Sequence, residues 1–240
     1  DTWMTSSLTP TITSKLVPNL EEQLYPMTMR PQAFEIIRTW LFYTIVKSHY
    51  HHNKLPWSEA MISGHGLDPQ GRKISKRLGN YQNPEAIIAE YGADALRYWA
   101  TGASLGANMR YNPEEVKKGK RTVLKLFNAS RFVLIHLENF KPDKKFKPKH
   151  PLDQWIISRL NNTAKTAGDY FDKYEYSKAR NKIDNFFWGD FADNYLEFVK
   201  HRVYDNKDPE AQNTLYALLL NIIKLYAPIL PFITEEIYQS

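Results

Sequence analysis

The second half of the chain carries apolar residues at helical spacing. From Asn112 onward they recur every three or four positions, the period of an amphipathic helix. The start, Asn-Pro-Glu-Glu, provides a capping residue, a first-turn proline and two acids. The pattern predicts a last helix from Thr234 and long helices near residues 113–139, 151–173, 176–204 and 210–226. Helices joined by short connections are typical of an α-helical bundle.

The first half has a mixed pattern. Residues 1–30 show little periodicity and several prolines, so we expect them to be irregular. A mostly buried helix is expected over residues 31–52, with Pro31 in its first turn. Residues 57–64 are typical of a short strand, and residues 67–71 of a turn. This half therefore resembles part of an α/β domain more than a bundle.

Two short helices are expected between these halves. Asn83-Pro84-Glu85 supplies a cap, a first-turn proline and an acid, and the helix that it begins should end near Gly92. A second start follows at Ala93. These helices form a small joint between the mixed region and the bundle.

Composition narrows the class of protein. The 240 residues are 42% hydrophobic, enough for a core, and no apolar run approaches the roughly 20 residues that span a bilayer, so no membrane segment is expected. The absence of cysteine excludes disulfides, cysteine-bound zinc and thiol catalysis. A net charge of +6 with 14% aromatic residues favours a nucleic-acid partner.

A basic, glycine-bounded segment, GRKISKRLGN, carries the clearest candidate chemistry. Lys73 and Lys76 supply compact positive charge and Ser75 a hydroxyl, while Gly71 and Gly79 let the backbone approach a ligand. Such a loop suits a polyphosphate whose negative charge grows during a reaction. A solvated basic turn would have the same composition, and the short motif alone leaves both readings open.

The wider segment resembles the second signature of class I aminoacyl-tRNA synthetases, in which D-x-x-G-x-K-M-S-K-S-x-G-N leads into a helix and then G-x-D-x-x-R. Ile74 stands in place of the usual Met, and Arg77 in place of the final Ser. Ten positions fall in register with the pattern: Asp68, Gly71, Lys73, Ser75, Lys76, Gly79, Asn80, Gly92, Asp94 and Arg97.

Four other segments resemble the valyl-tRNA synthetases within that class. They are DTWMTSSLTP, MRPQAFEIIRTWLFYT, KLFNASRF and APILPFITEEIYQ. The resemblance implies an internal fragment of an archaeal-like enzyme of this family, beginning after the editing insertion. The N-terminal residues, without an initiator Met or a signal-peptide pattern, fit that expectation, and a cytoplasmic location is implied.

The resemblance also implies the architecture. We expect a mainly α chain in three parts: the C-terminal part of a Rossmann-like α/β catalytic domain over residues 1–82, a helical stem-contact joint over 83–112, and an anticodon-binding helical bundle over 113–240. The catalytic part would carry the KMSKS-like loop at residues 73–77. The missing partners would be the nucleotide-binding half with the H-I-G-H signature and the editing domain.

Site residues follow from the same resemblance. Lys73, Ser75 and Lys76 would bind the ATP phosphates and act in catalysis, with Mg²⁺ arriving with ATP and no bound metal in this chain. Trp3, Ile36 and Trp40 would line the valine pocket, and Ile36 and Trp40, four apart, would share a helix face. Ordinary core packing explains these three equally well. His65, in SGHG, has the wrong position for the H-I-G-H signature.

The bundle would bind valine-specific tRNA. Asn128, Arg131 and Phe132 match the opening of the family's anticodon domain, and an arginine beside an aromatic ring suits unstacked RNA bases. A surface cation beside a core ring is the alternative. The lysine-rich connector between residues 140 and 151 would add non-specific attraction to phosphate.

Two other functions remain open from the sequence. One is a fragment of an isoleucyl-tRNA synthetase, and the other is a non-catalytic RNA-binding helical module with a vestigial basic loop. Whether the parent enzyme is a valyl- or an isoleucyl-tRNA synthetase, we expect the fragment alone to be inactive.

Overall fold

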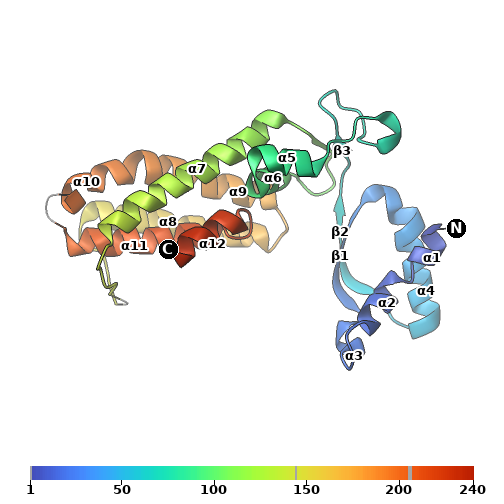
Figure 1. The fold of residues 1–240 in the computed structure, drawn as a ribbon. Helices are drawn as coiled ribbons and strands as arrows, with labels where there is room; N and C mark the ends of the chain where they lie inside the picture. The colour runs from blue at the N-terminus through green and yellow to red at the C-terminus, as the bar shows by residue number, and fades with distance from the viewer. Residues whose placement is uncertain (1, 144, 205–206) are drawn as a thin grey trace. The chain divides into compact units, whose positions relative to one another are not determined.

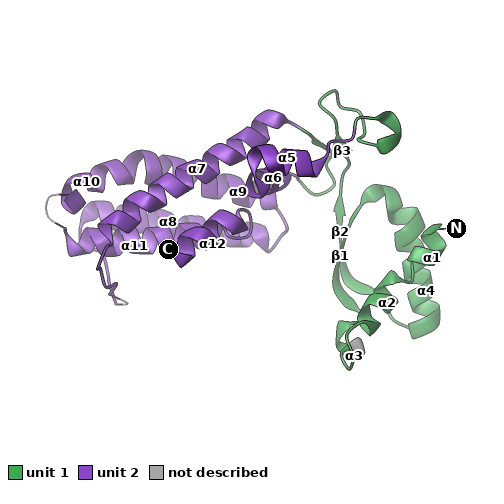
Figure 2. Ribbon diagram, in the orientation of Figure 1, with its two compact units in different colours: residues 1–80, 104–111 green, residues 81–103, 112–240 purple. Residues whose placement is uncertain are grey.

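The structure, a computed structural model, describes residues 2–143, 145–204 and 207–240. Two compact units divide the chain (Figure 2). Unit 1 comprises residues 1–80 and 104–111, and unit 2 comprises residues 81–103 and 112–240. Helices dominate, which confirms the mainly α fold class. Among the residues that the structure describes, no helix is both long and apolar enough to cross a bilayer.

Unit 1 is built on a parallel pair of strands, β1 (Met27–Ala33) and β2 (Trp57–Ser63). Their register places Met27 opposite Trp57 and Gln32 opposite Ile62. Parallel strands need a crossover connection. It consists of a 3₁₀ turn η1 (Phe34–Ile36), a π-helical segment η2 (Ile37–Leu41) and helix α4 (Phe42–His52). The strand expected at residues 57–64 is therefore confirmed.

The expectation that residues 1–30 are irregular is wrong. Residues 1–30 contain helices α1 (Thr2–Ser6), α2 (Thr9–Lys15) and α3 (Glu21–Leu24), then the start of β1; Asp1 lies outside the described residues. Pro10 lies in the first turn of α2, where a missing N–H does no harm. Pro31 lies in β1 and not in a first helical turn, so the helix expected from residue 31 begins later.

The rest of unit 1 holds the basic segment. A short strand β3 (Gly66–Leu67) pairs in parallel with β4 (Met109–Arg110), and a 3₁₀ turn η3 (Lys76–Leu78) follows. Gly64 passes so close to the chain before β4 that a Cβ there would lie 2.2 Å from the carbonyl oxygen of Ala107. This contact requires glycine, because no side chain fits.

Unit 2 is an array of helices (Figure 1). The expected starts at Asn83 and Asn112 are confirmed: each side-chain oxygen accepts a backbone N–H of the first turn at 3.0 Å. The last helix begins at Pro231 and not at Thr234. In chain order the helices are α5 (Pro84–Tyr91), α6 (Ala93–Ala100), α7 (Pro113–His136), α8 (Pro151–Phe171), α9 (Tyr176–Asn185), the π-helical η4 (Phe186–Tyr195), α10 (Leu196–Tyr204), α11 (Pro209–Tyr226) and α12 (Pro231–Gln239).

The core of unit 2 includes side chains from the long helices and from α6. Leu126, Ile156, Phe187 and Leu218 are completely buried, from α7, α8, η4 and α11. Tyr98 of α6 belongs to the same cluster. The joint helices therefore pack with the bundle in one unit, while residues 104–111 belong to unit 1. The three-part division at residues 82 and 112 stays a prediction.

Candidate functional site

Asp68 organises the basic loop. Its side chain is almost completely buried. Its Oδ1 accepts the backbone N–H groups of Gln70 and Arg72 at 3.0 and 2.8 Å, and its Oδ2 accepts from Arg72 Nε at 2.8 Å and Asn80 Nδ2 at 2.9 Å. Burial alone would raise the pKa of Asp68, but these hydrogen bonds and the Arg72 charge lower it to about 2. Asp68 is thus a charged anchor for the loop.

Asn80 closes the loop from its other end. Besides its bond to Asp68, its Nδ2 donates to the carbonyl oxygen of Lys73 at 3.1 Å, and its Oδ1 accepts the N–H of Ser75 at 2.9 Å. Gly71 and Gly79 have φ angles of +84° and +64°, a backbone conformation that favours glycine. The two ends of the motif therefore hold the segment between them in one conformation.

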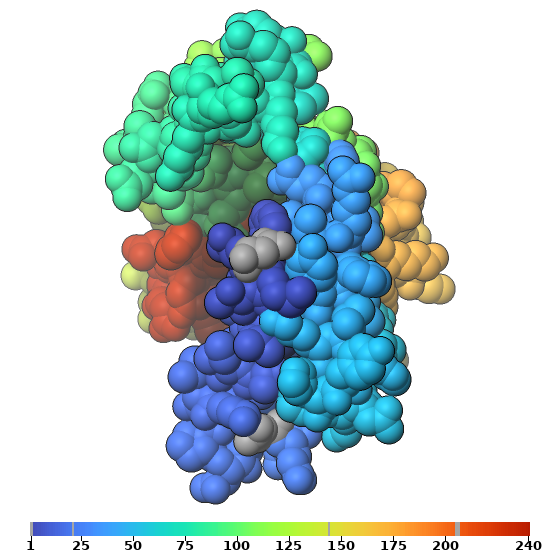
Figure 3. Space-filling view, turned by 90° about the vertical axis from the view of Figure 1, so that its right-hand side faces the viewer, coloured from blue at the N-terminus to red at the C-terminus, as the bar shows by residue number. Residues whose placement is uncertain are grey.

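This framework presents polar groups at the surface. Figure 3 shows the region of the loop, coloured teal, at the surface. Lys76 and Arg77 are exposed. Ser75 caps the η3 turn, where its Oγ accepts the N–H of Leu78 at 3.2 Å. The Lys73 ammonium bonds the carboxylate of Glu35, and the side chain of Lys73 remains 49% exposed. The structure thus brings Lys73, Ser75 and Lys76 together on one loop.

Glu35 is a neighbour of this loop that the sequence did not reveal. The hydrogen bond from Lys73 lowers the pKa of Glu35 against the opposing effect of burial. His65 Nδ1 lies 3.9 Å from the same Oε2 atom, and the His65 ring meets Phe34 edge-on at 4.5 Å. Glu35 and Lys73 are 38 residues apart, and no local spacing rule relates them.

The predicted valine-pocket residues lie in the N-terminal part of unit 1. Trp40 is buried, stacks on Trp57 at 5.6 Å, and donates its indole N–H to the Ser6 carbonyl oxygen at 3.0 Å. That bond joins Trp40 to α1, the helix that carries the more exposed Trp3. Ile36 is half-buried at the junction of η1 and η2. The expected α-helical face shared by Ile36 and Trp40 is wrong, because the backbone changes there from 3₁₀ to π geometry.

The predicted anticodon residues all lie on α7. Asn128 and Arg131 are exposed. Phe132 is half-buried, packs against the core, and meets the rings of His136 and Tyr204 edge-on at 4.6 and 6.1 Å. Burial lowers the pKa of His136, so this small aromatic cluster is uncharged near neutral pH.

The described part of the lysine-rich connector is attached to α11. Glu210 Oε1 accepts the backbone N–H groups of Lys149 and His150 at 2.5 and 2.6 Å. The N–H of Asp143 donates to Asn213 Oδ1 at 2.9 Å. Lys144 lies outside the described residues. These bonds hold both ends of the connector against one helix.

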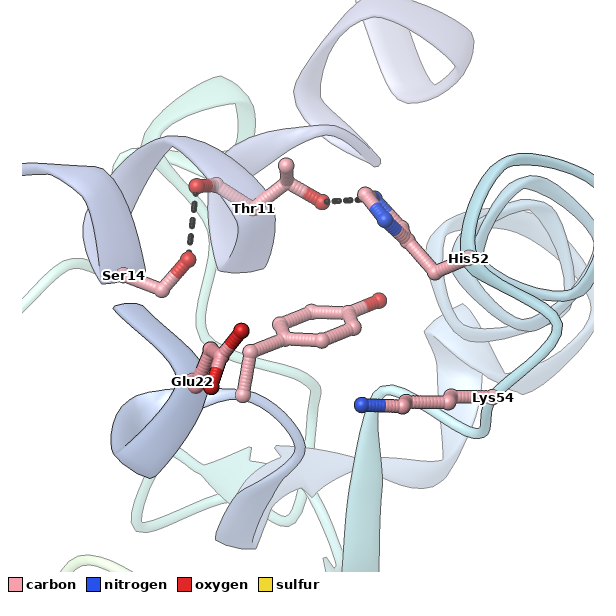
Figure 4. Close-up of a pocket in the computed structure, with 6 residues that line it drawn as sticks. Thr11, Ser14, Glu22, His52 and Lys54 are labelled. Carbon is pink, nitrogen blue, oxygen red and sulfur yellow. Dashed lines mark hydrogen bonds between the residues drawn. The ribbon is translucent and has the colours of Figure 1, made fainter. Parts of the chain in front are cut away.

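A separate hollow of about 340 Å³ lies elsewhere in unit 1. Figure 4 shows Glu22 and Lys54 beside it, with the Thr11 hydroxyl 3.3 Å from His52 Nε2. None of the predicted site residues lines it. Within the described ranges no group of three or more potential metal ligands occurs.

Two family models match the chain. The model "tRNA synthetases class I (I, L, M and V)" matches residues 1–112, and "Anticodon-binding domain of tRNA ligase" matches residues 153–240. Valine–tRNA ligases from Rickettsia felis and Rickettsia prowazekii are 44% and 45% identical over 260 residues. These matches cover 100% of this chain but only 30% and 32% of the relatives, so the chain spans about a third of their length.

Solved structures share the fold. A LeuRS–tRNA–LeuAMS complex from Agrobacterium radiobacter K84 matches with a TM-score of 0.80 at 19% identity, covering 100% of this chain and 31% of that one. Methionyl-tRNA synthetase of Mycobacterium tuberculosis, in complex with methionyl-adenylate, matches at 0.72 and 20% identity, covering 98% and 49%. These structures show the fold alone. The sequence matches show that the chain belongs to the class I tRNA synthetases, in the family of the valine–tRNA ligases.

Proposed function

We propose that this chain is the part of a valine–tRNA ligase that supplies the ATP-phosphate loop and the tRNA-binding bundle. The whole protein would activate L-valine with ATP and transfer it to its tRNA. The observation that carries the proposal is the loop framework, in which Asp68 and Asn80 hold Lys73, Ser75 and Lys76 on one surface segment.

The loop residues stabilise the negative charge that develops during activation. In the activation step, a carboxylate oxygen of valine bonds the α-phosphorus of ATP, and the bond from that phosphorus to the pyrophosphate oxygen breaks. Lys73 and Lys76 offset the charge gathered on the leaving pyrophosphate, and Ser75 can donate a hydrogen bond to it. In this structure the ammonium of Lys73 is paired with Glu35, whose negative charge would compete with the phosphates for it.

Magnesium enters as the counter-ion of ATP and not as a resident metal. Asp68 already accepts four hydrogen bonds from the loop and is therefore committed to the framework, not to a metal. Magnesium bound to a nucleotide needs few protein ligands, because phosphate oxygens and water fill most of its sphere.

Binding of the other two substrates rests on the remaining predicted residues. Trp40, with Trp3 and Ile36, would contact the valine side chain. On α7, the exposed Asn128 and Arg131 can reach RNA bases, and the half-buried ring of Phe132 supports one wall of that surface. The connector lysines would attract the phosphate backbone.

The test is valine-dependent exchange between ATP and pyrophosphate, measured in the full-length protein that carries this chain. Lys76→Ala should lower the exchange rate about 100-fold or more and Lys73→Ala comparably, the usual effect of removing a group that stabilises transition-state charge. Lys165→Ala, an exposed change on α8, is the matched control. The 240-residue chain alone should show no exchange.

Other outcomes would reassign the function. Exchange that depends on isoleucine and not valine would favour the isoleucyl enzyme, and no exchange with any amino acid would favour the non-catalytic RNA-binding module. Binding of the chain to valine and isoleucine tRNAs with exchanged anticodons, at two salt concentrations, tests the bundle separately. Binding that follows the valine anticodon supports the proposal, while equal and salt-sensitive binding to all of them refutes specific recognition.

A further inference from the structure

Gln32 is a buried carboxamide without a partner. Only 7% of it is exposed, and neither Oε1 nor Nε2 has a hydrogen-bond partner among the described residues. Its backbone oxygen, by contrast, accepts the Ser63 hydroxyl at 3.2 Å. A buried polar atom without a hydrogen-bond partner destabilises the folded protein, so two such atoms in one side chain require an explanation.

The position of Gln32 indicates a ligand. It is the penultimate residue of β1, at the carboxyl end of a parallel strand pair, the edge where ligands bind in α/β sheets. Alternate side chains of a strand share a face, so Gln32 lies on the same face as Arg30. The Arg30 guanidinium lies 3.9 Å from the centroid of the Trp40 ring. Gln32 thus shares a face with Arg30, which contacts the ring of Trp40, one of the predicted pocket residues.

Arg30 has an unpaired atom of its own. Its Nε is buried and has no hydrogen-bond partner within the described part of the chain. The face thus holds a guanidinium donor, a carboxamide donor and a carboxamide acceptor, beside the aromatic surface of Trp40. A free α-amino acid offers the complementary set: a carboxylate that accepts, an ammonium that donates and an apolar side chain.

We propose that Gln32, assisted by Arg30, binds the charged head of the amino-acid substrate. The carboxamide oxygen accepts from the α-ammonium group, while its N–H₂ and the Arg30 guanidinium donate to the carboxylate. This inference rests on the proposed function, because it names further groups in the same substrate site. It also explains why a polar side chain is buried here at the expense of stability in the ligand-free protein.

Gln32→Met in the full-length protein tests the proposal. Methionine has a similar volume and no polar head, so the melting temperature without ligand should rise, because a buried unpaired group is removed. The KM for valine in ATP–pyrophosphate exchange should rise at least tenfold, while the KM for ATP stays within twofold. The control is Gln23→Met, an exposed change on α3 that should alter neither value.

The combination of results decides the question. A KM for valine within twofold of wild type, with a raised melting temperature, would overturn the inference and leave Gln32 as an unpaired or hydrated group. If the methionine variant does not fold, Gln32→Glu serves instead, because it keeps the size of the side chain and places an acid against the carboxylate of valine. If valine stabilised that variant as much as it stabilises the wild type, the inference would also be overturned. Wild-type protein without valine-dependent exchange would overturn the proposed function itself, and the inference with it.

Discussion

Replacing Arg202 with methionine should destabilise unit 2 by about 3–5 kcal/mol. Arg202 of α10 donates two hydrogen bonds to the carboxylate of Asp153 in α8, at 2.8 and 3.0 Å, and one to Asp208 at 2.8 Å. Asp153 is completely buried, and its Oδ1 also accepts a hydrogen bond from the Tyr195 hydroxyl at 2.7 Å. Burial opposes the charge of Arg202, but the two carboxylates reverse that effect and raise its pKa. Without the guanidinium, a buried carboxylate would be left uncompensated.

Thermal and urea unfolding, followed by the helical circular dichroism signal, measures the loss. For a chain of this size, about 2–4 °C per kcal/mol predicts a fall in Tm of roughly 6–20 °C. The matched control is Lys200→Met on the same helix, because Lys200 pairs with Glu197 in an exposed position, where such pairs contribute about 1 kcal/mol or less. A loss no larger than that of the control would refute the reasoning. Combining Asp153→Leu with Arg202→Met should recover part of the loss, since no buried acid remains at residue 153.

Three further changes test other parts of the structure. Gly168→Ala in α8 should stabilise the fold by about 0.5–1 kcal/mol, because nothing lies within 4 Å of the new Cβ. Gly119→Ala in α7 should destabilise it, because the new Cβ would lie 2.9 Å from the Ala95 carbonyl oxygen. Urea unfolding measures both changes. Asn112→Ala should cost about 1 kcal/mol through loss of the α7 cap, measured in the same assay. Because the pKa of Asp68 is lowered to about 2, its stabilisation of the loop should be fully present above about pH 4 and be lost as the pH falls toward 2. Hydrogen exchange of residues 70–80 would report this loss, and opening of the loop already at pH 5 would contradict the prediction.

Much of unit 2 could be predicted from the sequence because its signals are local. Asn83 and Asn112 begin helices through bonds to residues two positions away. Their first-turn prolines and acids reinforce the same choice. Within the expected helix over residues 176–204, the change to π geometry in η4 was not predictable, since residues there have ordinary helical spacing.

The structure of the N-terminal region does not follow from its local sequence pattern, because it depends on pairing with a distant segment. Met27–Ala33 is a strand through its parallel pairing with Trp57–Ser63, some 30 residues later. Proline is typical of a first helical turn, yet it also fits a strand where its missing N–H is not needed, as Pro31 does in β1. Local patterns do not distinguish these two uses.

The same contrast applies to the loop site. The register of the motif located Asp68, Lys73 and Asn80 together, because all of their framework bonds are within 12 residues. Glu35 and Gln32 were not identified, since their significance comes from an ion pair across 38 residues and from the absence of partners in a buried strand. Neither property leaves a trace in sequence spacing.

The second half of the signature, G-x-D-x-x-R, has a structural role that its sequence position conceals. Asp94 accepts the N–H groups of Phe232 and Ile233 in the first turn of α12, at 3.3 and 2.8 Å, and Arg97 donates to the carbonyl oxygens of Pro228 and Ile229, just beyond α11, at 2.9 and 3.2 Å. An acid at a helix N-terminus and a base beside the carbonyls after a helix C-terminus each oppose the helix dipole favourably. One short helix therefore holds the α11–α12 turn from both sides. Because these bonds fix α6 to the turn between the last two helices, α6 is part of the bundle's own framework within unit 2.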